Sequence, residues 1–282
     1  MTDALVDPEF ISKPPSSGSV VVIDTRPAEE FRRGCIPEAV NIPEFFTYLL
    51  TDENGGLDGM ARFFAGALAK HGVTNGDTIV FCEDALTTGY GQSCRGYFLL
   101  KYLGHRKVHV LNGGLAAWRA AGLSLVTPGG PRVSKDYNVK QSTNLVATKE
   151  DVLRSLGATG VVLLDCRDRE EWIGLSSSPY GRDFCPRKGR IPGAVWLEWY
   201  RLMETRNGYP RFRSVQDCLA EFSKVGIGTE TRVIVYCFKG SRASTTLLAM
   251  RAAGITQVKN YFASWNEWSR DARLPIDERL LI

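Results

Sequence analysis

The chain has 282 residues, of which 44% are apolar, 23% charged and 10% aromatic. This composition supports packed cores and excludes a disordered, collagen-like or disulfide-stapled protein, and at about 150 residues per domain the length predicts two domains. The net charge of +4 comes from an excess of Lys and Arg in residues 141–282. It is too weak to indicate a nucleic-acid partner, but it favours an anionic ligand for the second half.

The cysteines and the N-terminal sequence bear on the cellular compartment. Seven cysteines are spread along the chain without a CxxC pair, so we expect neither a disulfide framework nor a metal site. No apolar run approaches the ~20 residues of a membrane helix, and the N-terminal sequence MTDALVDPEF lacks the apolar core of a secretory signal. We therefore expect a cytoplasmic protein with no membrane partner.

Short apolar runs alternate with helical segments in chain order. In the first half the runs end at Asp24, Cys82 and Leu111, and a helix is predicted over residues 91–103. The second half repeats this order, with a corresponding helix over residues 241–253. The alternation predicts an α/β fold in which each half forms a mostly parallel sheet flanked by helices.

Matched motifs indicate a tandem duplication with a period near 140 residues. An Ile-Pro-x-Ala-Val sequence occurs at residues 36–40 and again at 191–195. From its proline to a later cysteine, Cys82 or Cys237, there are 45 positions in both halves. Such a constant spacing is not expected by chance.

The two copies are separated by the turn-forming sequence TPGGP at residues 127–131. We therefore place the first domain at residues 1–125, a linker at 126–142 and the second domain at 143–282.

Residues that both copies share are expected to serve the fold, and residues of one copy alone are candidates for chemistry. Asp24 and Arg26 are matched by Asp165 and Arg167, so we expect an ion pair at a strand end in each copy. Arg167 is in addition a candidate for placing an anion. Cys166, which lies between the second pair, is expected to be a core residue.

The candidate nucleophile is the cysteine that begins a short loop between an apolar run and a helix, Cys237-Phe238-Lys239-Gly240-Ser241-Arg242. A short turn with glycine can point successive N–H groups at one anion, and the following helix directs the positive end of its dipole there. The Lys and Arg of the loop add formal charge. Such surroundings lower a thiol pKa and favour the reactive thiolate.

Cys82 is interpreted as the counterpart of Cys237 in the first copy. It is followed by Glu83 and Asp84, and its loop is five residues longer. Because neighbouring carboxylates oppose ionisation of a thiol, we expect Cys82 to be inert.

About 14 residues are inserted before the Ile-Pro motif of the second copy. This segment contains Arg182, Arg187, Lys188 and Arg190 against a single acid, Asp183. It is either a solvated surface or a basic rim for an anionic substrate.

Taken together, these residues resemble the tandem-domain rhodanese family of sulfurtransferases over nearly the whole chain. The marks are the paired Asp-x-Arg and Ile-Pro-x-Ala-Val segments, the loop at residues 237–242, and the aromatic stretch at residues 260–268. In that family the C-terminal copy carries the cysteine and the N-terminal copy is inactive.

The resemblance implies a ping-pong sulfur transfer. The Cys237 thiolate takes the outer sulfur of thiosulfate as a persulfide, and cyanide or a thiol then accepts that sulfur. Lys239 would meet the sulfonate, and the other expected substrate-binding residues are Phe238, Gly240, Ser241, Arg242, Arg167 and Arg187. No cofactor is required, and a monomer is expected.

Three alternatives remain open at this point. Lys239-Gly240 fits thiosulfate-type members, but Phe238 stands where those members carry arginine, so 3-mercaptopyruvate is an alternative donor. A cysteine phosphatase or arsenate reductase would need Cys-x5-Arg, whereas four residues separate Cys237 from Arg242. A regulatory or sulfur-carrier-binding module without catalysis is the third alternative.

Overall fold

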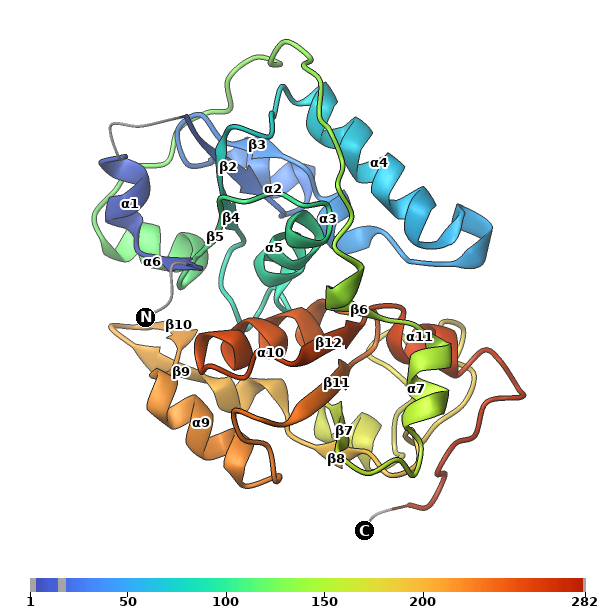
Figure 1. Cartoon of the computed structure of the whole chain (residues 1–282). Helices are drawn as coiled ribbons and strands as arrows, with labels where there is room; N and C mark the ends of the chain where they lie inside the picture. The colour runs from blue at the N-terminus through green and yellow to red at the C-terminus, as the bar shows by residue number, and fades with distance from the viewer. Residues whose placement is uncertain (1–3, 15–18, 281–282) are drawn as a thin grey trace. The chain divides into compact units, whose positions relative to one another are not determined.

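A computed structural model describes residues 4–14 and 19–280. The chain forms two compact units, Met1–Thr143 with Met203–Phe212, and Asn144–Leu202 with Arg213–Ile282. Each unit contains one five-stranded parallel sheet flanked by helices, as predicted (Figure 1). The boundaries predicted at residues 125 and 143 remain predictions.

The first unit has the strand order β1-β5-β4-β2-β3. Its strands are β1 Leu5–Val6, β2 Val20–Asp24, β3 Val40–Asn41, β4 Thr78–Cys82 and β5 Val108–Leu111. Its helices are α1 Pro8–Ser12, α2 Ala28–Arg33, α3 Glu44–Thr47, the 3-10 turn η1 Asp52–Asn54, α4 Gly56–Lys70, α5 Gln92–Tyr102 and α6 Gly114–Ala120.

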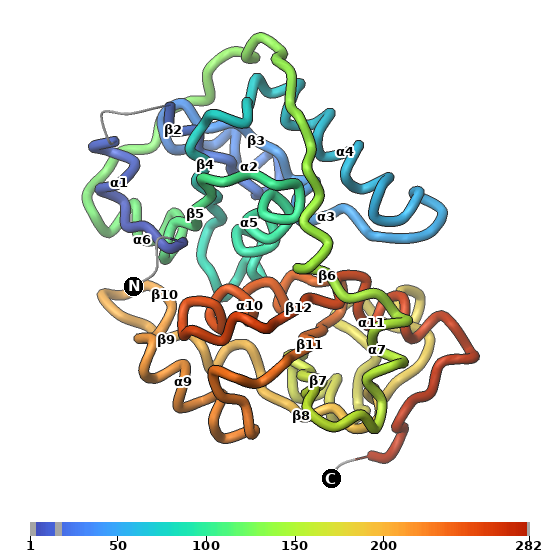
Figure 2. The backbone as a smooth tube through the Cα atoms, viewed as in Figure 1, coloured from blue at the N-terminus to red at the C-terminus, as the bar shows by residue number. Residues whose placement is uncertain are grey.

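The second unit repeats this arrangement as β6-β12-β11-β7-β8, which confirms the predicted duplication. Its sheet strands are β6 Val146–Ala147, β7 Val161–Asp165, β8 Val195–Trp196, β11 Arg232–Tyr236 and β12 Val258–Tyr261. Its helices are α7 Lys149–Ser155, α8 Arg169–Trp172, α9 Val215–Ser223, α10 Ser241–Ala252 and α11 Ser264–Trp268, with the 3-10 turn η3 Trp199–Leu202. The 3-10 turn η2 Thr143–Leu145 includes the last residue of the first unit and the first two residues of the second. The backbone path between β7 and β8, which includes the inserted segment, can be followed in Figure 2.

A hairpin of β9 Met203–Arg206 and β10 Tyr209–Phe212 lies in the sequence of the second copy but belongs to the first unit. The Phe212 N–H donates to Oδ1 of Asn112 at 3.1 Å. The ring of Tyr209 packs so closely on Gly113 that a Cβ there would lie 2.6 Å from it. No pattern in the sequence predicts that this hairpin belongs to the first unit.

Burial explains why the central strands are continuous apolar runs. All five residues of β4 are buried, as are the last four of β11, because helices cover both faces of a parallel sheet. The helix α10 is buried over Ser241–Met250 although it is rich in Ser and Thr. Its hydroxyls donate to backbone carbonyls one turn back, for example Ser244 Oγ to the Gly240 carbonyl at 2.6 Å, so this polar helix can lie in the core.

The sheet register corrects one match between the copies. Asp24 pairs with Cys82 in the first sheet, and Asp165 pairs with Tyr236 in the second. Cys82 is therefore the counterpart of Tyr236, and Glu83 is the counterpart of Cys237. The predicted match of Cys82 with Cys237 is wrong by one position, because two similar apolar runs that end in cysteine are not in the same register.

Candidate active site

Cys237 directly follows β11, at the carboxyl end of the parallel sheet. The N–H of Gly240 donates to its sulfur at 3.2 Å, and the backbone N–H groups of Lys239 and Ala243 also interact with it. We call these three N–H groups the anion cradle. They lie at the start of α10, a helix of 12 residues, where the helix dipole favours negative charge.

The cradle requires glycine at position 240. Gly240 has φ 86°, which places it in the left-handed region. A Cβ there would lie 2.5 Å from the ring of Phe262 and 2.8 Å from the Phe262 carbonyl oxygen. A side chain would therefore meet both an unfavourable backbone conformation and a steric clash.

The aromatic stretch near the C-terminus holds the loop from the other side. The Cys237 N–H donates to Oγ of Ser264 at 3.1 Å. The Trp265 N–H donates to the Cys237 carbonyl at 3.0 Å, and the Asn266 N–H to the Phe238 carbonyl at 2.9 Å. The beginning of α11 thus fixes the backbone that carries the nucleophile.

These surroundings favour a thiolate. Burial by itself would raise the pKa of Cys237, but it is outweighed by a hydrogen bond from Cys166, the charge of Arg242 and the cradle N–H groups. The pKa of the Cys237 thiol is consequently held well below its ordinary value. The residue is only 1% exposed, so the anion is sheltered from bulk water.

Arg242 supports the loop through acidic partners. Its guanidinium binds Glu171 through two contacts of 2.6 and 3.1 Å and Asp168 through one of 2.9 Å. The negative charges around Arg242 raise its pKa despite its burial, so it remains a cation beside Cys237. The charge of Arg242 therefore acts on the Cys237 sulfur, while its N–H groups bind Glu171 of α8 and Asp168, the N-cap residue of that helix.

Lys239 and Phe238 contact the inserted segment through Tyr180. The Lys239 Nζ lies 5.3 Å from the centre of the Tyr180 ring, and the Phe238 and Tyr180 rings are 5.0 Å apart. A cation over an aromatic face is attracted to it. An aromatic residue of the insertion therefore contacts both residues that follow the nucleophile, which the sequence analysis missed.

Arg167 serves the fold in the same way as Arg26. It binds Asp165 at 2.6 Å and the Gly189 carbonyl at 2.8 Å, as Arg26 binds Asp24 at 2.7 Å and a carbonyl at 2.8 Å. Its Nη1 has no hydrogen-bond partner among the described residues. No described contact brings Arg167 to the Cys237 sulfur, and its role toward a substrate anion remains a prediction.

Arg187, an expected substrate-binding residue, uses its guanidinium donors within the fold. Its Nε, Nη1 and Nη2 all donate to backbone carbonyls, those of Ser269, Leu274, Trp268 and Asp271. Arg190 likewise binds Asp277 at 2.9 Å. These two arginines tie the insertion to the C-terminal segment, and a role of Arg187 toward a substrate remains a prediction.

In the first unit the carboxyl group of Glu83 stands where the thiolate of Cys237 stands in the second. Glu83 is fully buried, and it accepts the N–H groups of Gln92 at 3.2 Å and Ser93 at 3.1 Å. Burial raises the pKa of Glu83 to about 8. The start of α5 is thus capped by the protein's own side chain, and the counterpart of the nucleophile is a carboxyl group that cannot carry sulfane sulfur.

Cys166 is buried as predicted, but it is not a simple core residue. Its thiol donates to the Tyr236 carbonyl oxygen at 3.2 Å, and its interaction with Cys237 lowers the pKa of the Cys237 thiol. Cys166 lies next to Cys237 because Asp165 pairs with Tyr236 on the adjacent strand. This pairing is known only once the sheet is formed.

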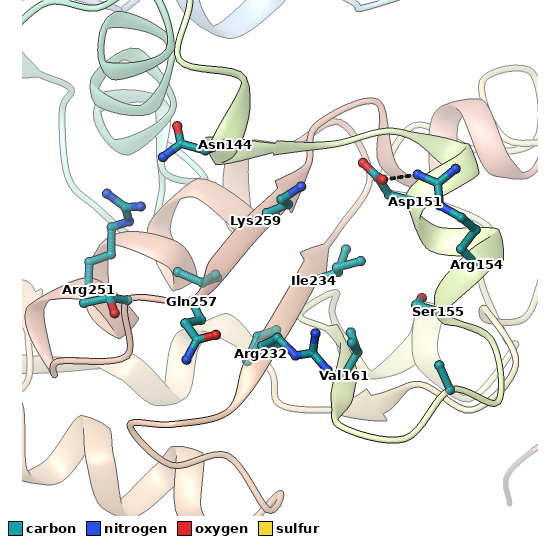
Figure 3. Close-up of a pocket in the computed structure, with 14 residues that line it drawn as sticks. Asn144, Asp151, Arg154, Ser155, Val161, Arg232, Ile234, Arg251, Gln257 and Lys259 are labelled. Carbon is teal, nitrogen blue, oxygen red and sulfur yellow. Dashed lines mark hydrogen bonds and ion pairs between the residues drawn. The ribbon is translucent and has the colours of Figure 1, made fainter.

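A separate pocket of about 550 Å³ lies at the opposite edge of the second sheet (Figure 3). Its lining includes the amino ends of β7, β11 and β12 and the basic side chains of Arg154, Arg232, Arg251 and Lys259. Arg154 is paired with Asp151. Cys237 follows the carboxyl end of β11, so this pocket is not part of the candidate site.

Residues 4–14 and 19–280 contain neither a metal-binding cluster nor a membrane-spanning helix. No cluster of three or more His, Cys, Asp or Glu side chains there is arranged to hold a metal ion. Within the same residues, no helix has the length and apolar character needed to cross a bilayer.

Comparison with known proteins identifies the family. The Rhodanese-like domain matches residues 7–121 and 148–271. The chain belongs to the rhodanese-like family. It carries two copies of the domain, as its resemblance implied.

Two relatives match 97% and 78% of the chain. A thiosulfate sulfurtransferase of Azotobacter vinelandii is 26% identical over 97% of this chain and 96% of its own length. A thiosulfate sulfurtransferase of Corynebacterium glutamicum is 31% identical over 78% of this chain and 72% of its own length. The family and these relatives support sulfurtransferase activity.

Solved structures show the same fold. The anaerobic ergothioneine biosynthesis enzyme of Chlorobium limicola, in complex with trimethyl histidine, has a TM-score of 0.85. It is 21% identical, and the match covers 99% of this chain and 71% of that one. A related structure, with a TM-score of 0.82 and 22% identity, contains ergothioneine covalently linked with a persulfide.

Proposed function

We propose that this protein transfers a sulfane sulfur from thiosulfate to cyanide or a thiol through a persulfide on Cys237. The observation that carries the proposal is the buried cysteine held in an anion cradle, with its pKa lowered well below the ordinary value. Thiolate, donor and persulfide are all anions, and one set of N–H donors can stabilise each of them in turn.

The first half-reaction is an attack of the Cys237 thiolate on the outer sulfur of thiosulfate. A bond forms between the two sulfur atoms, the original S–S bond breaks, and sulfite leaves with the bonding electron pair. In the second half-reaction the acceptor attacks the outer sulfur of the persulfide, and the Cys237 thiolate is the leaving group. No net oxidation or external cofactor is needed.

Lys239 is the proposed partner of the donor's sulfonate. It is 9% exposed and belongs to the loop that forms the cradle. Phe238, Gly240, Ser241 and Arg242 would shape and charge the same loop, while Arg167 would act only through the strand-end ion pair.

A second candidate donor is 3-mercaptopyruvate. The aromatic pair of Phe238 and Tyr180 favours it, since an apolar wall beside Lys239 suits a carboxylate on a short carbon chain better than it suits a compact sulfonate. Comparison of kcat/KM for the two donors, with cyanide as acceptor, decides between them.

Steady-state kinetics test the class of reaction. We expect parallel double-reciprocal lines for donor and acceptor, which indicate a ping-pong mechanism, and no turnover by Cys237→Ser. Cys218→Ser, which changes a buried cysteine of α9, is the matched control and should retain activity. Turnover by Cys237→Ser would contradict the residue assignment, and absence of turnover with both donors would favour a binding module instead.

A further inference from the structure

Cys166 and Cys237 are neighbours across two adjacent parallel strands. Asp165 is in register with Tyr236, so each cysteine is the first residue beyond a paired position. The Cys166 N–H donates to the Tyr236 carbonyl at 3.1 Å, which continues the ladder past the named strands. Neighbouring strands lie about 4.8 Å apart, and disulfides form between Cα atoms about 4.4–6.8 Å apart. A bond between these two sulfurs therefore needs little backbone movement.

Both thiols are buried at this pair of strand ends. Cys166 is 0% exposed and Cys237 is 1% exposed, and the two thiols interact, since Cys166 lowers the pKa of Cys237 and Cys237 raises the pKa of Cys166. The Cys166 thiol itself donates to the Tyr236 carbonyl at 3.2 Å. A group on Cys237 that points into the cradle would leave the inner sulfur facing Cys166.

The first unit shows what the fold alone requires at these positions. Thr25 is the counterpart of Cys166, and its N–H and Oγ1 both bind the Cys82 carbonyl, at 3.0 and 3.1 Å. A hydroxyl therefore satisfies this strand end, with Glu83 in place of the nucleophile. A pair of thiols occurs only in the copy that carries the candidate active site.

We propose that Cys166 is a resolving thiol that discharges an unused Cys237 persulfide as hydrogen sulfide. The inference rests on the proposed persulfide. The sulfur of Cys166 attacks the inner sulfur of the persulfide, a Cys166–Cys237 disulfide forms, and hydrosulfide leaves with the bonding electron pair and takes the Cys166 proton. One persulfide and one thiol thus give one disulfide and one hydrogen sulfide, with no external oxidant.

The surroundings of Cys166 make this discharge slower than normal transfer. Burial and the adjacent Cys237 thiolate raise the pKa of Cys166 well above its ordinary value. Little of the Cys166 thiol is therefore ionised while Cys237 carries no persulfide sulfur. Formation of the persulfide moves negative charge away from the inner sulfur, and hydrosulfide is a good leaving group because its conjugate acid is more acidic than a cysteine thiol. An acceptor that arrives promptly takes the sulfur first; an idle persulfide is resolved internally.

A disulfide between the two cysteines stops turnover until a dithiol reductant restores both thiols. Exchange with an external dithiol is a sufficient route, since it breaks the disulfide by two successive thiolate attacks. The site would then have two products, a persulfidated acceptor or free hydrogen sulfide, and the supply of acceptor would decide between them.

The test follows the persulfide in the absence of an acceptor. The full chain is loaded with thiosulfate, freed of small molecules and kept anaerobically, and its intact mass and released sulfide are measured over time. The wild type should start about 32 Da heavier by one sulfur atom, and should end two hydrogen atoms lighter than the reduced chain, with one sulfide released per chain. Peptide mapping should then find Cys166 linked to Cys237, and dithiothreitol should restore loading.

Cys166→Ser and Cys166→Thr are the matched variants, the second being the residue of the first copy at this position. Both should keep the added sulfur at least tenfold longer and release correspondingly less sulfide. Equal persulfide lifetimes in wild type and variants, or sulfide release without the Cys166–Cys237 peptide, would overturn the proposal while leaving the sulfur-transfer function intact. Failure of every protein to take up sulfur would instead contradict the proposed function itself.

Discussion

At the scale of single residues, the two copies place different ionisable groups at one position. Cys237 and Glu83 both follow the central strand, and each accepts N–H groups from the start of the next helix. The thiolate is stabilised by Arg242, whereas burial raises the pKa of Glu83. The same fold therefore supports a nucleophile in one copy and a self-capped helix in the other.

Replacement of Arg242 tests the electrostatic account of the thiolate. Arg242→Gln should raise the pKa of Cys237 by about one unit, because a cation close to an anion commonly lowers its pKa by about 1–3 units. The pH dependence of iodoacetamide labelling, read on the Cys237 peptide by mass spectrometry, measures this shift. Arg242→Lys keeps the charge and should move the midpoint less; identical midpoints in all three proteins would contradict the account.

Glu83 predicts a pH-dependent stability. Its pKa of about 8 lies above the ordinary value of 4.5, so the folded chain holds a proton that the unfolded chain releases. Its contribution is therefore fully present below pH 4.5 and is lost progressively as the pH rises to about 8, by up to about 1.4 kcal/mol per pH unit. Glu83→Gln should gain thermal stability relative to wild type as the pH rises over this range, and a constant difference between the two proteins would count against the assigned pKa.

At the scale of elements, the site is a strand–loop–helix unit fixed at both ends. The loop donates Gly240 to the cradle, and the beginning of α11 binds the carbonyls of Cys237 and Phe238. Ser264, which accepts the Cys237 N–H, has φ 57°, a conformation that non-glycine residues rarely adopt. The loop is thus held in place by neighbouring elements rather than by its own sequence alone.

Gly240→Ala should destabilise the second unit and abolish labelling of Cys237 as a low-pKa thiol. The backbone conformation costs about 1–2 kcal/mol for a residue with Cβ, and the clash with Phe262 adds about 1–3 kcal/mol. Gly226→Ala is the matched control, since Gly226 has φ 76° but open space around its Cβ position. Chemical denaturation should show the larger loss for Gly240→Ala, and equal losses would exclude the clash as a cause.

At the scale of the whole molecule, the chain is a duplication in which one hairpin of the second copy belongs to the first unit. The sheets share one strand order, yet the hairpin of β9 and β10 belongs to the first unit although its sequence lies in the second copy. The pairing of Asn112 with Phe212 and the packing of Gly113 against Tyr209 join segments about a hundred positions apart. Each copy is therefore not a self-contained stretch of sequence.

Removal of the Tyr209 side chain should loosen this attachment. Tyr209→Ala leaves a space beside Gly113, so hydrogen exchange should accelerate in β10 and α6, with a local loss of about 3–5 kcal/mol, as for other large aromatic deletions. Thr205→Ala in the exposed part of β9 should leave exchange unchanged. Equal protection in all three proteins would show that the hairpin is held by other contacts.

Local patterns in the sequence predict the sheets, the central helices and the Cys237 loop. The predicted run ends at Asp24, Cys82 and Leu111 coincide with the ends of β2, β4 and β5. Such features depend on hydrophobic periodicity and turn residues, which are local.

The features that escaped prediction depend on non-local geometry. The sheet register shows that Glu83, and not Cys82, occupies the position in the first copy that Cys237 occupies in the second. The contact of Cys166 with Cys237 and the carbonyls around Arg187 join distant segments, as does the hairpin. No composition or spacing rule reveals these contacts, because they arise only when strands and loops are assembled.

The most direct test of the central claim is to locate the sulfur after a single exposure to thiosulfate. Digestion without reductant and mass spectrometry should find one added sulfur, about 32 Da, on the Cys237 peptide at the earliest times, with one sulfite released per chain. The adduct should disappear on addition of cyanide. An unmodified Cys237 peptide, or sulfur bound mainly to another of the seven cysteines, would contradict the assignment of this site.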